Sequence, residues 1–224
     1  MNKAAVYIFL ILIYLAIAKS SSHNEIGAFY INTTDDIDKL VTGAPVSVIL
    51  TDIHTTGFLI KSHYQKWRVV HGYRSSEEII VQSSPKFTFQ NKDHVGMEIF
   101  RRSSENLIAN STPLPPGSIF LDDPAFGRWR EDNGIKSWRF YRAYRHLPSS
   151  LGWGDFRPNY DFAKQIQIHI EQNKPFFGFK NEFGSSGSFS QKAFPDFFSK
   201  NRQKSNTLKK MFKHYFHTEF EQEI

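Results

Sequence analysis

The stretch from residue 128 to residue 157 concentrates side chains that could recognise a ligand. These thirty residues hold six of the chain's eleven arginines and three of its four tryptophans. The guanidinium group of arginine is a planar fork that pairs with carboxylate or phosphate oxygens, and aromatic faces can stack on sugar rings. The pattern predicts a surface for an anionic glycan or another anionic polymer of the cell envelope. The residues that we expect to contact this ligand are Trp129, Trp138, Arg139, Arg142, Arg145 and Trp153.

Two other interpretations fit the same stretch. Arginines can stack on aromatic rings of their own domain and pair with its carboxylates, in which case the cluster is core architecture and not a site. Interleaved basic and aromatic residues also suit single-stranded nucleic acid. An exported protein seldom meets nucleic acid, so we do not expect a nucleic-acid partner. A third possibility is that the partner is another exported protein.

Acid/base chemistry could use three residues in and near this stretch, namely His146, Asp155 and Asp122. Carboxylates beside an aromatic ring would suit cleavage of a glycosidic bond. The alternative is that Asp122-Asp123-Pro124 forms a turn, where Asp and Pro are favoured, and that His146 is structural. An envelope-acting hydrolase is therefore the alternative to a binding protein, and whether the protein is an enzyme stays open.

The residue types that are missing exclude several kinds of site. The chain has no cysteine, which excludes thiol nucleophiles, iron–sulfur clusters and disulfide scaffolds. Asp52, His54, His63 and His71 match no known metal-ligand spacing, and no glycine-rich phosphate-binding motif is present. We therefore predict neither a bound metal nor a cofactor.

The net positive charge lies entirely in the second half of the chain. The whole chain has 28 basic and 22 acidic side chains, a formal charge of +6. Residues 1–100 contain 9 of each, whereas residues 101–224 contain 19 basic and 13 acidic side chains. Because the excess is confined to one half, an anionic partner is expected to meet that half.

The first eighteen residues have the pattern of a secretory signal peptide. Lys3 precedes an uncharged, mostly apolar run from Ala4 to Ala18 that ends in the small-x-small sequence Ala16-Ile17-Ala18. This run is shorter than the ~20 apolar residues of a membrane span. We expect cleavage before Lys19, a periplasmic or secreted location, and no transmembrane span in the mature protein. An uncleaved N-terminal anchor is the alternative. The absence of cysteine and the overall composition favour a bacterial source.

The remaining sequence predicts an α+β fold that packs as one compact domain. After the signal peptide at 1–18 we expect a polar lead-in at 19–40, a β-rich antiparallel unit at 41–111, a proline-rich loop at 112–117, and an Arg/aromatic hairpin unit with C-terminal helices at 118–224. Three prolines keep the loop from being a helix or a central strand.

Particular elements would position the candidate residues. Short apolar runs predict strands at 46–50, 57–60, 67–70, 78–81 and 87–89. Asn133-Gly134 between two aromatic-rich runs predicts a β-hairpin. If Trp138 to His146 is extended, Trp138, Arg142 and His146 share one face with Phe140 and Tyr144. Helices are expected at 159–173, which Pro175 ends, and from Ser205 to the C-terminal region.

Overall fold

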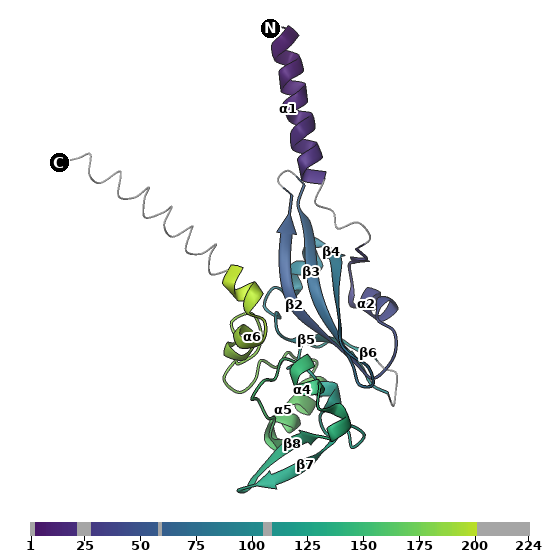
Figure 1. Cartoon of the computed structure of the whole chain (residues 1–224), viewed down its shortest axis with the longest axis vertical. Helices are drawn as coiled ribbons and strands as arrows, with labels where there is room; N and C mark the ends of the chain where they lie inside the picture. The colour runs from purple at the N-terminus through teal and green to yellow at the C-terminus, as the bar shows by residue number, and fades with distance from the viewer. Residues whose placement is uncertain (1–2, 22–27, 58–59, 105–108, 201–224) are drawn as a thin grey trace, which may run out of the picture.

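A mixed sheet built by the first half of the chain is the main element of the fold (Figure 1). The computed structural model describes residues 3–21, 28–57, 60–104 and 109–200. Within these residues the strand order is β1-β4-β3-β2-β5-β6, and every neighbouring pair is antiparallel except β1 and β4. The strands are β1 (Tyr30–Ile31), β2 (Val46–Thr56), β3 (Ser62–His71), β4 (Glu77–Ser83), β5 (Glu98–Arg102) and β6 (Ala109–Asn110).

The sheet is covered on both faces, and strand alternation explains how. Successive side chains of a strand point to opposite faces, so on β2 the side chains of Val48 and Leu50 enter one core cluster and Ile49 enters another. The first cluster includes Ile37 of α2 (Thr34–Leu40). The second is formed with the second half of the chain. This double burial is why β2 begins with six buried residues in a row.

Two short helices lie beside the sheet, and one of them replaces a predicted strand. Asp36 accepts the backbone N–H of Thr33 at 2.9 Å in a capping box that starts α2. The strand predicted at 87–89 is wrong, because these residues lie in α3 (Pro85–Asn91). Ser84 accepts the Phe87 N–H and proline stands in the first turn, which are both helix-start features. The pattern of three residues was too short to separate the two periodicities.

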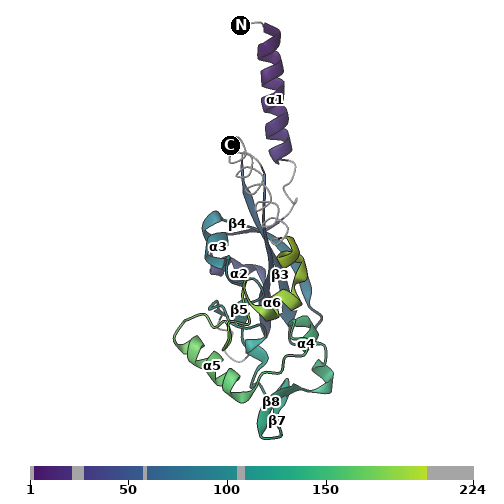
Figure 2. The ribbon, with the colours of Figure 1, turned by 90° about the vertical axis from the view of Figure 1, so that its left-hand side faces the viewer.

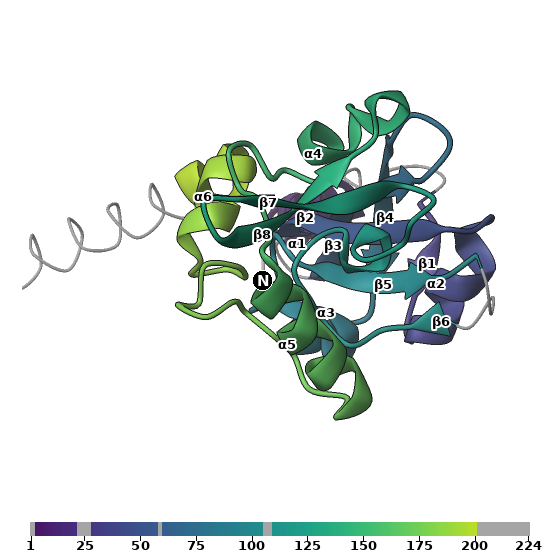
Figure 3. The ribbon, with the colours of Figure 1, turned by 90° about the horizontal axis from the view of Figure 1, so that it is seen from below.

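The second half of the chain forms a hairpin and several helices, and the hairpin lies at the end of the fold opposite α1 (Lys3–Ser21) (Figure 2). Figure 3, which looks onto this end, shows the hairpin with helices around it. The elements are η1 (Ser118–Phe120), β7 (Gly127–Asp132), β8 (Ile135–Phe140), η2 (Arg142–Tyr144), α4 (Leu147–Ser150), α5 (Tyr160–Glu171) and α6 (Ser188–Ala193). Together these elements give the α+β class that the sequence predicted.

The predicted hairpin is confirmed at Asn133 and Gly134. Both residues have positive φ angles, 52° and 76°, as a tight two-residue turn requires. The predicted helix at 159–173 is also confirmed as α5, whose Asn159 cap accepts the Phe162 N–H at 2.8 Å. The helix predicted from Ser205 lies outside the described residues.

The extended segment that we predicted from Trp138 to His146 ends early. Strand β8 stops at Phe140, and the backbone then turns into η2. The Tyr141 N–H donates to the Phe126 carbonyl at 2.9 Å, and the Tyr144 ring packs on Phe126 with 4.8 Å between centroids. Packing on Phe126 therefore replaces continued strand pairing, and the predicted face shared by Trp138, Arg142 and His146 does not form.

The proline-rich loop at 112–117 passes through the interior. It contains no helix and no ladder strand, as three prolines dictate, but Leu114 forms an isolated bridge with Glu98 of β5. Residues 114–117 are buried. The loop therefore joins the sheet to the second half through buried backbone contacts.

Helix α1 projects from the rest of the fold (Figure 1). Its large apolar side chains, including Tyr7, Phe9 and Leu12, are more than half exposed. Among the described helices, none combines the length and apolar character that crossing a membrane would require.

Candidate functional site

The largest of the described pockets lies between α4 and α6 and is named the basic pocket here. It has a volume of about 1000 Å³. The loop after α4 supplies half of its lining residues, and the others come from α6, from α4 and from the end of η2. Its lining residues are Arg145, Pro148, Ser149, Gly152, Trp153, Gly154, Asp155, Phe156, Arg157, Phe189, Lys192 and Ala193.

The basic pocket carries three cations against one carboxylate. Arg145, Arg157 and Lys192 are all exposed, and within the described residues none of them forms an ion pair. Asp155 is the acidic residue of the lining, and it forms no ion pair there either. The Arg157 guanidinium is held in place because its Nη1 donates to the carbonyls of Gly154 and Phe156, both at 2.7 Å. The pocket therefore presents a preorganised positive potential.

The tryptophans predicted to stack on a ligand pack inside the domain instead. Trp138 and Trp153 are each 2% exposed. The Trp153 Nε1 donates to the Pro116 carbonyl at 2.8 Å, and its ring packs on Phe140 with 5.3 Å between centroids. Trp129 is half-buried against Trp138, and its Nε1 donates to Asp122 Oδ1 at 2.6 Å. Trp153 forms part of the pocket wall, but no face of its ring is free to stack on a sugar.

The predicted arginines divide between two pockets. Arg145 lines the basic pocket, whereas Arg139 and Arg142 line a smaller pocket of about 390 Å³ on the hairpin, together with Arg128 and Arg130. Sequence reasoning did not include Arg157 or Lys192 in the site. Arg157 belongs to the same arginine-rich stretch and could have been included, but Lys192 lies on α6 and no local pattern links it to the stretch.

The described pockets do not assemble the predicted acid/base group. Asp155 lines the basic pocket, and Asp122 lines a different pocket of about 470 Å³. Asp122 has a φ angle of 64° in a turn and accepts the Trp129 indole. His146 lines none of the described pockets, and its Nε2 is buried without a hydrogen-bond partner. Within the described part of the chain, no three His, Asp or Glu side chains lie close enough to hold a metal ion.

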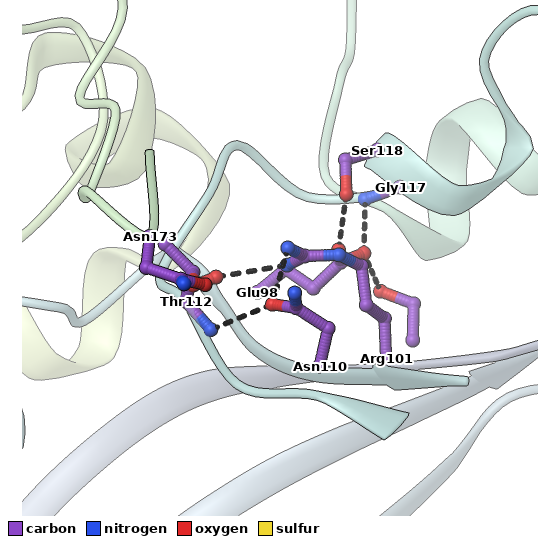
Figure 4. Close-up of polar contacts among 8 residues, drawn as sticks. Glu98, Arg101, Asn110, Thr112, Gly117, Ser118 and Asn173 are labelled. Carbon is purple, nitrogen blue, oxygen red and sulfur yellow. Dashed lines mark hydrogen bonds and ion pairs between the residues drawn. The ribbon is translucent and has the colours of Figure 1, made fainter. Parts of the chain in front are cut away.

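A buried ion pair that the sequence analysis did not identify lies beside the pocket that holds Asp122. Glu98 is fully buried, and Arg101 is 3% exposed. Glu98 accepts hydrogen bonds from the Ser47 and Ser118 hydroxyls and from the Gly117 N–H (Figure 4). The Arg101 Nη1 lies 3.4 Å from Glu98 Oε1.

Arg101 is fixed by two further acceptors. Its Nη1 donates to the Thr112 carbonyl at 2.8 Å, and its Nη2 donates to Asn110 Oδ1 at 2.6 Å (Figure 4). Burial raises the pKa of Glu98 despite the neighbouring Arg101. Because both charged groups are held by hydrogen bonds from the surrounding fold, we assign this cluster a structural role: it ties β5 to the proline-rich loop.

Arg145, Arg157, Lys192 and Asp155, with the aromatic wall of the basic pocket, are thus the residues of this fold that are best placed to meet a ligand. No protein-family model, curated protein or solved structure matches the chain.

Proposed function

We propose that the protein is an exported binding protein whose basic pocket engages an anionic glycan or another anionic polymer of the cell envelope. The observation that carries the proposal is a set of three cations around the basic pocket that form no ion pair with any described residue, namely Arg145, Arg157 and Lys192. Like charges gathered around one cavity repel each other, and a bound anion removes that cost.

The chemistry of the lining suits a charged sugar. Guanidinium groups pair with carboxylate, sulfate or phosphate oxygens in a bidentate manner. Partly buried Phe156 and Phe189 and the side chain of Pro148 add apolar surface between the cations. A glycan has both features, because its anionic groups alternate with the weakly polar faces of its rings.

Binding is favoured over hydrolysis by the composition of the same pocket. Cleavage of a glycosidic bond uses a pair of carboxyl groups, one acting as general acid. Asp155 is the acidic residue of the lining, and His146 is not among the lining residues. The pocket therefore offers recognition groups without the second acid/base group that hydrolysis would need.

Removing cations from the basic pocket is expected to weaken binding of an acidic polysaccharide. Arg145→Gln with Lys192→Gln changes two exposed side chains that form no ion pair in the described structure. A charge-assisted hydrogen bond contributes about 1.5 kcal/mol, which is about tenfold in affinity, so the double variant should bind ~100-fold more weakly. Titration calorimetry of the full-length protein with polygalacturonate and with heparin measures this loss, and neutral dextran should not bind.

The matched control for this experiment is Lys61→Gln with Lys86→Gln. It removes the same charge from exposed positions on the sheet side of the fold and should retain wild-type affinity. The proposal fails if neither polysaccharide binds the wild-type protein, or if the pocket variant and the control variant lose affinity equally.

Export should remove residues 1–18, which form most of α1. Since the large apolar side chains from Tyr7 to Leu15 are exposed and do not belong to either core cluster, their removal should leave the folded body intact. In a bacterial host we expect the exported protein to begin at Lys19, as read by N-terminal sequencing. Leu12→Lys interrupts the apolar run and should keep the protein in the cytoplasm with Met1 intact. Exported protein that still carries residues 1–18 would contradict cleavage, and export of the Leu12→Lys variant would contradict the signal.

A further inference from the structure

We infer that the basic pocket continues into the arginine-lined pocket of the hairpin, so that the two together form a track for a linear acidic polysaccharide. This inference rests on the proposed function and adds to it the shape of the ligand. A single anion would fill one pocket, whereas a chain with regularly repeated charges can occupy both.

The hairpin pocket gathers like charges that the fold itself does not neutralise. Strand register places Arg128 of β7 directly opposite Arg139 of β8, an arrangement that destabilises a sheet. Arg130 and Arg142 line the same pocket. Among the described residues, these four arginines form one ion pair, between Arg139 and Asp132 at 3.3 Å. The remaining charges are available to an external anion.

The helix η2 joins the two pockets. A 3₁₀-helix has three residues per turn, so the side chains at positions i and i+3 lie one above the other. Arg142 opens η2 and Arg145 caps it, and the Arg145 N–H donates to the Arg142 carbonyl at 3.4 Å. Arg142 lines the hairpin pocket and Arg145 lines the basic pocket. One turn of backbone thus presents a cation to each pocket, which places the two groups of cations next to each other along the chain.

The aromatic residues of the track favour a polysaccharide over single-stranded nucleic acid. Nucleic-acid grooves of this kind stack successive bases on exposed rings. Among the rings that line the two pockets, Tyr141 is 40% exposed and Trp153 is buried. The other rings are partly buried, namely Phe140, Phe156 and Phe189. The track therefore offers repeated charge contacts and partly covered apolar surface, without the series of exposed rings that stacking of successive bases would need.

The length of the ligand tests this inference separately from the proposed function. Oligogalacturonates from the monomer to a long oligomer are titrated into the full-length protein. Affinity should rise with length until both pockets are filled and then level off. Arg128→Gln with Arg130→Gln should weaken binding of the long oligomer about tenfold or more. The affinity for the shortest oligomer that the wild-type protein binds should not change. Lys61→Gln with Lys86→Gln is again the matched control.

The outcomes distinguish the two claims. Equal affinity for short and long oligomers, with no effect of the hairpin variant, overturns the track and leaves the proposed function standing. No binding of any oligogalacturonate or of heparin overturns both. Tighter binding of single-stranded DNA than of an oligogalacturonate with the same number of charges overturns the polysaccharide as the ligand.

Discussion

Arg101→Leu is expected to destabilise the fold by about 3–5 kcal/mol at neutral pH, the usual cost of removing one partner from a buried ion pair. The substitution leaves the fully buried Glu98 carboxylate without a counter-charge and removes the donor to the Thr112 carbonyl. Serine hydroxyls and one backbone N–H would still bind Glu98, but they do not neutralise its charge. Urea denaturation of the variant and the wild-type protein measures the loss.

The pH dependence of this loss identifies its cause. Burial holds the pKa of Glu98 above its ordinary value, so the stability that this group contributes is complete below its unfolded-state pKa and declines as the pH rises through the folded-state pKa. Removing Arg101 raises that pKa further, because the attraction that opposed burial is gone. The cost of Arg101→Leu should therefore be smaller at mildly acid pH than at neutral pH.

Glu98→Gln serves as the control because it cannot titrate. The free energy of unfolding of the wild type minus that of Glu98→Gln should be highest at acid pH and should fall as the pH rises. The account is contradicted if Arg101→Leu has wild-type stability, or if its loss of stability does not change with pH. Either result would show that the Arg101 charge does not stabilise the Glu98 carboxylate.

Trp153→Ala is expected to destabilise the fold by about 3–5 kcal/mol, because it empties a large buried site. The ring fills space between Phe140 and Phe156, and its Nε1 bonds the proline-rich loop at Pro116. Trp153→Phe retains most of the volume and loses this one hydrogen bond, so it should cost about 1 kcal/mol. Chemical denaturation of both variants gives these values.

The same variants decide whether Trp153 belongs to the core or to a stacking surface. With the ring packed in the core, Trp153→Phe should bind acidic polysaccharide as tightly as the wild-type protein does. A Trp153→Ala variant with wild-type stability and lost binding would instead make this tryptophan a ligand-contacting residue.

Local chemistry made parts of the fold predictable from the sequence. Asn133-Gly134 defines the hairpin because both residues tolerate the positive φ angles of its turn. Asn159 and Pro175 bracket α5 because one caps a helix start and the other cannot continue a helix. The end of β8 at Phe140 was not predictable, since it depends on packing against Phe126, which lies fourteen residues earlier in the chain.

The sequence indicated where the basic pocket lies, but not which side chains line it. The density of arginines marked residues 128–157, yet a sequence does not show which face of each aromatic ring is covered. For that reason Trp138 and Trp153 were assigned to a ligand and prove to be buried. Glu98 stands in the apolar run Met97-Glu98-Ile99-Phe100, a signal that could have indicated a buried carboxylate. Its partner Ser118 comes from a distant segment and left no such signal.

The salt dependence of polysaccharide binding tests the central claim most directly. Ions in solution screen charge contacts, so the dissociation constant of the wild-type protein for an acidic polysaccharide should rise steadily with salt concentration. Arg145→Gln with Lys192→Gln should bind more weakly and show a shallower dependence on salt, because fewer charge contacts remain to be screened. Binding that is insensitive to salt, or a variant whose salt dependence equals that of the wild-type protein, would contradict recognition of an anion by the basic pocket.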